Sequence, residues 1–149
     1  MKHTLITALF ASIAATAVPA LSDDAGDPAA GKRAFSQCQA CHVVVDDRGN
    51  TLAGRRSRTG PNLFGIIGKR AGTVEGFRYS RELTEAGEQG LVWNEETFVG
   101  YSLDPVKFLR EFLDDRRARG RMTFKVRKPD DAADLYAFIR SAGQDPGDN

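Results

Sequence analysis

The sequence predicts one mostly α-helical domain over residues 27–142, built from about five helices. Segments with a helical spacing of apolar residues are separated by loops rich in glycine and proline, and the strand–helix alternation of an α/β fold is absent from the sequence. Three segments also begin with residues that favour a helix start, as an N-cap or as a proline in the first turn: Asp27-Pro28, Asn94 and Asp104-Pro105.

Each element is expected from local signals, in chain order. The first helix is expected over residues 29–41, where apolar and small residues recur every three or four positions. Val43-Val44-Val45 indicates a short strand, followed by a polar turn over residues 46–50. The later helices are expected over residues 82–88, from 94 to about 101, from 104 to about 114, and over 129–141.

The first 20 residues have the features of a secretory signal peptide. A short basic start precedes an apolar run over residues 5–17, and small residues lead to a cleavage site after Ala20 or Ser22. A membrane anchor is the alternative, but the run is shorter than the roughly 20 residues that a spanning helix needs. We therefore expect an exported protein, located in the periplasm, with residues 143–149 as a C-terminal tail.

The most informative motif is Cys38-Gln39-Ala40-Cys41-His42. The spacing C-x-x-C-H is typical of c-type haem attachment, in which two thiols form thioethers and the imidazole binds iron. Zinc is an alternative, but the chain has only two cysteines and two histidines, so a four-ligand site would need carboxylates. A thioredoxin-like redox pair is another, although such pairs normally lie in α/β folds. The motif and the leader together favour haem.

Removal of the leader leaves one histidine, His42, and one methionine, Met122. An iron that takes one histidine and one methionine can therefore use only this pair within one chain. The alternative is that Met122 is an apolar gap-filler. The stretch 116–124 around it is basic and contains glycine, which is unlike the apolar stripe of a core helix.

Charge is strongly segregated along the chain, although the net charge without the leader is close to zero. Residues 48–81 carry eight basic groups and one acidic group, whereas residues 82–104 carry six acidic groups and no basic group. Residues 105–128 carry nine basic and three acidic groups. Such blocks are often only solvated surface, but two basic blocks that flank a cofactor can also form a docking field.

Six motifs together resemble class I cytochromes c. Residues 31–42 are similar to the first helix of that family, residues 59–68 to its proximal loop, and residues 76–80 and 90–93 to its haem-pocket segments. Tyr101, Asp104-Pro105 and residues 121–125 complete the series in the family's order. The resemblance is greatest to the bacterial cytochrome c2 type in its long form, which is related to mitochondrial cytochrome c.

The resemblance implies a fold of about five helices around one covalently bound haem c, with crossed N- and C-terminal helices. At that crossing Gly31 would allow a close approach, and Phe35 would pack on Leu135 and Phe138. The resemblance also implies a role for each of eight site residues. They are Cys38 and Cys41 as the thioether pair, His42 as the proximal ligand, Met122 as the distal ligand, Pro61 as acceptor of a bond from the His42 ring, Tyr79 and Trp93 as partners of a haem propionate, and Tyr101 as a neighbour of the ligand sulfur.

Three positions depart from the family pattern. Gly120 stands where a threonine is usual, Lys69 stands where an arginine is common near a propionate, and the usual Pro-Gly turn before the methionine is missing. These departures suggest a more mobile methionine loop than in mitochondrial relatives.

The resemblance implies an electron-transfer protein and not an enzyme: a one-electron carrier that receives electrons from a cytochrome bc1-type complex and passes them to a terminal oxidase or a photosynthetic reaction centre. It would dock transiently through its Arg/Lys patches, as a monomer and without a nucleic-acid partner. The alternatives are a haem subunit or electron donor of a periplasmic dehydrogenase or reductase, and a haem peroxidase or sensor with a labile Met122.

Overall fold

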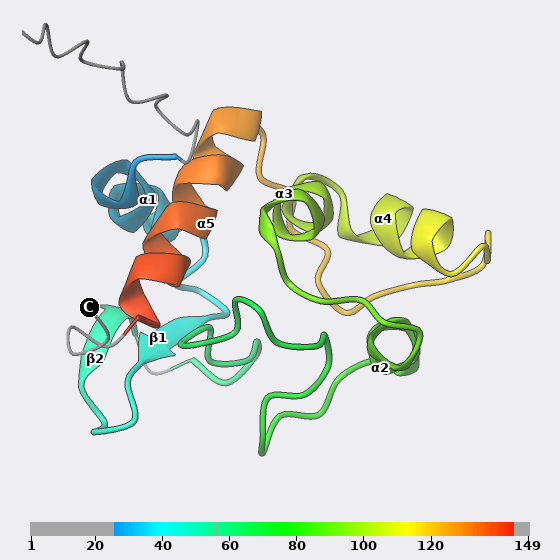
Figure 1. The fold of residues 1–149 in the computed structure, drawn as a ribbon, viewed down its shortest axis with the longest axis horizontal. Coiled ribbons are helices and arrows are strands. Elements are labelled where there is room, and N and C mark those ends of the chain that lie inside the picture. Colours follow the sequence, from blue (N-terminus) through cyan, green and yellow to red (C-terminus); the bar gives the residue numbers. More distant parts are fainter. Residues whose placement is uncertain (1–25, 56, 145–149) are drawn as a thin grey trace, which may run out of the picture.

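The computed structural model describes residues 26–55 and 57–144. The predicted signal peptide lies outside the described residues, as does most of the predicted C-terminal tail. The described part of the chain forms five α-helices, one short 3-10 helix and one two-stranded sheet (Figure 1). Their bounds are α1 Pro28–Ala34, η1 Phe35–Gln37, β1 Val43–Val45, β2 Thr51–Gly54, α2 Arg81–Glu88, α3 Glu95–Leu103, α4 Pro105–Phe112 and α5 Pro129–Ala142. None of these helices is long and apolar enough to cross a membrane.

The first and last helices cross closely, as predicted, with α1 lying against α5 (Figure 1). A Cβ atom added at Gly31 would lie only 1.9 Å from the carbonyl oxygen of Asp134 and 2.8 Å from the Cβ of Phe138, so only glycine fits this crossing. The rings of Phe35 and Phe138 meet edge to face, with centroids 5.8 Å apart. Both side chains and Leu135 are buried.

The first helix is shorter than the predicted 29–41, and that prediction is wrong at its C-terminal end. The α-helix ends at Ala34, and the chain tightens into η1 before a hydrogen-bonded turn. The amide of Cys38 donates to the carbonyl of Phe35 at 2.8 Å, and the amide of His42 donates to the carbonyl of Cys38 at 2.9 Å. Such tightening is common where the last carbonyls of a helix lack partners.

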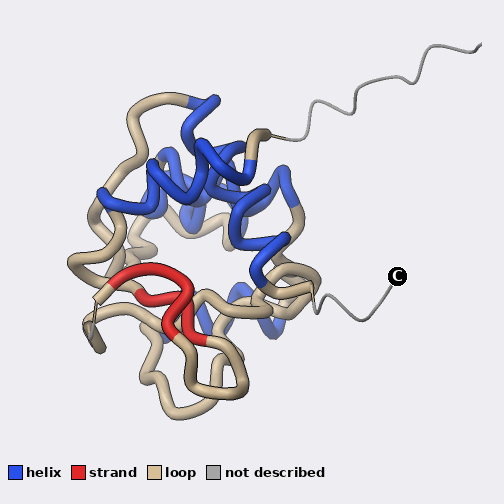
Figure 2. The backbone as a smooth tube through the Cα atoms, turned by 90° about the vertical axis from the view of Figure 1, so that its left-hand side faces the viewer, coloured by secondary structure: helices blue, strands red, loops and turns tan. Residues whose placement is uncertain are grey.

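The strand predicted at Val43–Val45 forms β1, and its antiparallel partner β2 is an element that the sequence does not predict. In Figure 2 this hairpin lies on the side of the molecule away from most of the helices. The side chain of Asn62 binds both backbone groups of Val45, accepting from its amide at 3.0 Å and donating to its carbonyl at 2.8 Å. The hairpin thereby fixes the loop that contains Pro61.

The three middle helices begin at side-chain caps. Ser80 accepts from the amide of Leu83 at 3.3 Å, and Asp104 accepts from the amide of Lys107 at 3.1 Å. Asn94 and Thr97 form a reciprocal capping box at the start of α3. The caps predicted at Asn94 and Asp104 are therefore confirmed, while α3 ends two residues beyond the predicted Tyr101 and α4 ends two residues before the predicted Asp114.

Candidate functional site

One cavity of about 320 Å³ brings together all eight residues that the sequence singled out. This volume lies within the range typical of cofactor pockets, roughly 300–1,000 Å³. The eight come from the turn before β1, the loop after β2, the approach to α2, the start of α3, α3 itself and the loop before α5: Cys38, Cys41, His42, Pro61, Tyr79, Trp93, Tyr101 and Met122. They are thus scattered in sequence and share one space.

The two thiols lie in the turn that follows η1, and both are half-buried. Burial, together with the neighbouring Cys41 thiol, raises the pKa of Cys38 to about 11. A reactive redox pair needs the opposite, a thiolate with a lowered pKa. Within residues 26–55 and 57–144, no cluster of three histidine, cysteine or acidic side chains is arranged to hold a metal ion. The redox-pair and zinc alternatives therefore find no support in this geometry.

The imidazole of His42 is oriented by the backbone of the loop that faces it. Its Nδ1 lies 3.0 Å from the carbonyl oxygen of Pro61, an arrangement that places a proton on Nδ1 and leaves the lone pair on Nε2. Burial lowers the pKa of His42, and the Pro61 carbonyl opposes that shift. The neutral form, which binds metals, is thereby favoured at neutral pH.

Gly60 allows this loop to lie flat against the imidazole. Its amide donates to the carbonyl of Cys41 at 2.7 Å. A Cβ atom at this position would lie 2.4 Å from the Cε1 atom of His42, which is far inside van der Waals contact. The glycine therefore has a steric function at the site, because any side chain would displace the ring or the loop.

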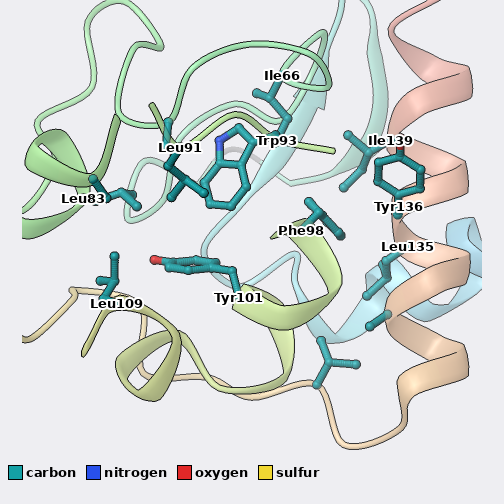
Figure 3. Close-up of a cluster of buried hydrophobic side chains, with 14 of the residues drawn as sticks. Ile66, Leu83, Leu91, Trp93, Phe98, Tyr101, Leu109, Leu135, Tyr136 and Ile139 are labelled. Atoms are coloured by element: carbon teal, nitrogen blue, oxygen red, sulfur yellow. The ribbon is translucent and has the colours of Figure 1, made fainter. Parts of the chain in front are cut away.

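Aromatic side chains form a second wall of the cavity. The rings of Trp93 and Tyr101 meet edge to face with centroids 5.1 Å apart, and Figure 3 shows them beside Leu91 and Phe98 in the buried cluster. Burial raises the pKa of Tyr101 to about 12, with a smaller contribution from Tyr79, and burial also raises the pKa of Tyr79. Both phenols are therefore neutral at physiological pH and able to donate hydrogen bonds.

Met122 lies in the long loop between α4 and α5 and is half-buried against the hydrophobic core. The loop is attached on both sides of the methionine. Before it, the carbonyl of Ala118 accepts from the Nε of Arg110 at 3.1 Å. After it, the amide of Val126 donates to the carbonyl of Ser102 at 2.9 Å. These contacts place the thioether in the same cavity as His42, although 79 positions separate the two residues in the chain.

The lining as a whole fits a c-type haem. It is predominantly apolar, with side chains from α2, α3 and α5 and from the loops before α2 and before α5. Two thiols, one imidazole and one thioether complete that surface. Several lining residues were not assigned to the site from the sequence: Leu83, Phe98, Ser102, Arg121, Leu135 and Ile139. Lys69 does not line the cavity; its side chain is exposed, with its Nζ beside Gly65.

Comparison with known proteins identifies the family. No protein-family model matches the chain. The chain is 58% identical over 121 residues to cytochrome c2 of Rhodovulum adriaticum, covering 81% of this chain and 96% of that protein. It is 49% identical over 142 residues to cytochrome c2 of Cereibacter sphaeroides, covering 95% and 97%. The crystal structure of cytochrome c2 from Rhodobacter sphaeroides superposes with a TM-score of 0.78 at 51% identity, covering 81% of this chain and 99% of that one.

The chain belongs to the cytochrome c2 family. The predicted class I cytochrome c fold is therefore confirmed, with five α-helices and little strand in residues 26–55 and 57–144. Cytochromes c2 are electron carriers and not enzymes, and they carry one covalent haem c. The C-x-x-C-H motif of this chain supplies the attachment site that such a haem requires.

Proposed function

We propose that this member of the cytochrome c2 family is an exported one-electron carrier whose iron is bound by His42 and Met122. The observation that carries the proposal is their shared cavity. Once a leader is removed, they are also the only histidine and the only methionine in the sequence. Two axial ligands from the protein leave the iron no open position, which suits electron transfer and disfavours catalysis on small molecules.

The residues of the proximal side attach and orient the cofactor. Cys38 and Cys41 would form the thioethers, and His42 would bind iron through Nε2 while its Nδ1–H donates to the Pro61 carbonyl. The bound haem supplies a one-electron ferric/ferrous couple. Met122 contributes a neutral thioether, which favours the ferrous state and raises the reduction potential.

The aromatic wall has two roles in this proposal. Tyr79 and Trp93 would donate hydrogen bonds to a haem propionate, and Tyr101 would lie near the sulfur of Met122. Trp93 and Tyr101 are each only 8% exposed, so they also exclude water from the cavity. A dry, rigid environment keeps both redox states in nearly one geometry, which a rapid electron carrier needs.

We propose that this carrier meets its partners, which are membrane redox complexes, from the periplasm. A cytochrome bc1-type complex would be the donor, and a terminal oxidase or photosynthetic reaction centre the acceptor. The basic residues of 48–81 and 105–128 would steer this carrier, as a monomer, towards acidic surfaces on those complexes. Arg121 belongs to this basic surface and also lines the cavity, so the positive charge extends to the cofactor site.

The test is the weak near-infrared band of ferric haem that is typical of a methionine–iron bond. We expect the band in the native holoprotein and its complete loss in Met122→Ala, with the Soret absorption of attached haem retained. Thr123→Ala is the matched control, because it alters the neighbouring residue of the same cavity without removing a thioether. A native protein without the band would refute the ligation, and would favour the peroxidase or sensor alternatives instead.

A further inference from the structure

We propose that the hydroxyl of Ser102 is a polar contact of the cofactor in the haem cavity and that it lowers the reduction potential. The inference rests on the proposed binding of the haem iron by His42 and Met122 in that cavity. It starts from burial. Among the described residues, Ser102 is the only buried polar side chain apart from tyrosine and tryptophan, and it is only 5% exposed.

Ser102 lies on the face of α3 that borders the cavity. Phe98, Tyr101 and Ser102 are spaced three and four positions apart, so they share one face of the helix, and all three line the cavity. Figure 3 shows Phe98 and Tyr101 extending from this helix into the buried cluster. The backbone carbonyl of Ser102 accepts from the amide of Val126 at 2.9 Å. The residue is therefore held in place by its backbone, independently of its hydroxyl.

The hydroxyl of Ser102 has no hydrogen-bond partner within residues 26–55 and 57–144. The hydroxyls of Thr84 and Ser141, which also lie in helices, donate to carbonyls four and three residues earlier, at 3.2 and 2.9 Å. Every side-chain oxygen that is fully enclosed among the described residues does have a partner. The hydroxyl of Ser102 therefore borders free space, and the space that Ser102 lines is the haem cavity.

The other aliphatic hydroxyls of the cavity are placed differently. Ser80 accepts from the amide of Leu83 as the cap of α2, and Thr59 and Thr123 are exposed. A buried hydroxyl without a partner destabilises a protein, and serine is not favoured inside a helix. Folding alone therefore does not account for the serine at position 102, whereas a contact with the cofactor does.

The charge of the cofactor gives the direction of the effect. An iron porphyrin with two neutral axial ligands carries one more positive charge in the ferric state than in the ferrous state. A hydroxyl can rotate and turn its oxygen towards that charge. Because this interaction is stronger in the ferric state, it lowers the reduction potential, and a methyl group cannot replace it. One such dipole changes the ferric/ferrous equilibrium by about three- to tenfold, which corresponds to about 28–59 mV at about 59 mV per tenfold.

The experiment is a redox titration of the holoprotein and of four variants. Ser102→Ala removes the hydroxyl with little change in size. Ser102→Thr and Ser102→Val both add a β-branched side chain, and they differ in the hydroxyl that threonine keeps. Ser141→Ala is the control outside the cavity, because it removes a helical hydroxyl that already has a partner, the carbonyl of Phe138. The near-infrared band is recorded for each protein, so that a change in ligation is detected separately.

We expect Ser102→Ala to raise the reduction potential by about 28–59 mV with the near-infrared band retained. The potential of Ser102→Val should lie above that of Ser102→Thr by a similar amount, and Ser141→Ala should keep the native potential. Thermal unfolding of the ferrous proteins tests for a structural role. Ser102→Ala should be no less stable than the native protein, because no hydrogen bond within the protein is lost.

Equal potentials of the native protein and Ser102→Ala would overturn the role of Ser102 while the ligation stands. A lower potential in Ser102→Ala, or equal potentials of Ser102→Thr and Ser102→Val, would also overturn it, because the hydroxyl would then not stabilise the ferric state. An equal shift in Ser141→Ala would do the same, since the effect would not depend on the cavity. A native protein without the near-infrared band would overturn both proposals through the ligation itself.

Discussion

The close crossing of α1 and α5 makes a specific prediction for Gly31→Ala. A Cβ atom at this position would lie 1.9 Å from the Asp134 carbonyl oxygen and 2.5 Å from its carbon, whereas ordinary contacts begin near 3.4 Å. The obstructing atoms belong to the backbone of α5 and cannot rotate away. The two helices must therefore separate, which loosens the contact between Phe35 and Phe138.

The size of the effect follows from two opposing contributions. Overpacking of a tight core typically costs about 1–3 kcal/mol, and the upper end applies where backbone must move. Alanine is favoured over glycine inside a helix by about 1 kcal/mol, which offsets part of this cost. We therefore expect the free energy of unfolding to fall by about 2 kcal/mol and the melting temperature to fall by roughly 5–8 °C for a domain of this size.

The assay is thermal and guanidinium unfolding of the holoprotein, with Gly100→Ala as the matched control. Gly100 also lies inside a helix, but its added Cβ would meet only the ring of Phe108, at 3.1 Å. That ring can shift by a few tenths of an ångström, so we expect a change within about 1 kcal/mol of zero. If Gly31→Ala were as stable as Gly100→Ala, the crossing would have room for a methyl group and the steric argument would be wrong.

Three further predictions concern the proximal loop, a helix cap and docking. Gly60→Ala should displace the ring of His42, because the added Cβ would lie 2.4 Å from the Cε1 atom of that ring. We expect a changed reduction potential or a reduced yield of attached haem. A native reduction potential at full haem yield would contradict this prediction. Asp104→Ala should destabilise the protein by about 1 kcal/mol at neutral pH through loss of the α4 cap. The hydrogen bond from Lys125, and then that from the Lys107 amide, lowers the pKa of Asp104, so its contribution is complete above pH 3.8 and disappears as the pH falls through the lowered value. The test is to measure the free energy of unfolding of the native protein and of Asp104→Ala at neutral and at acidic pH. If the difference between the two were the same at both pH values, the ionised carboxylate would not be the source of the stabilisation. Finally, electron transfer to a membrane redox complex should slow as ionic strength rises, and a rate indifferent to salt would rule out steering by the basic blocks.

Helix starts could be predicted from the sequence because caps are local. Asp27, Asn94 and Asp104 each bind an amide two or three residues ahead, so the signal and the structure lie within one turn. Helix ends were less predictable. The first helix was expected to continue to Cys41, but it ends at Ala34 and is followed by a 3-10 segment and a turn. The C-terminal end of this helix has no side-chain signal comparable to an N-cap.

Contacts between distant segments could not be predicted from the residues alone. The strand Thr51–Gly54 has little pattern of its own and forms because it pairs with β1. The bond from Arg121 to the Arg78 carbonyl is a stronger example, because the acceptor is a backbone atom that every residue possesses. The sequence places Arg121 only in a basic stretch.

The attachment chemistry follows from the amino-acid sequence alone, since two thiols and an imidazole within five residues define it without any long-range contact. The sequence also limited the candidates for a histidine–methionine pair to His42 and Met122. Packing of distant segments adds that these two residues lie in one cavity, that Pro61 orients the imidazole, and that Arg121 binds the Arg78 carbonyl. The reason is that local signals depend on neighbours within a helical turn, whereas a cavity depends on how segments up to a hundred residues apart pack around one core.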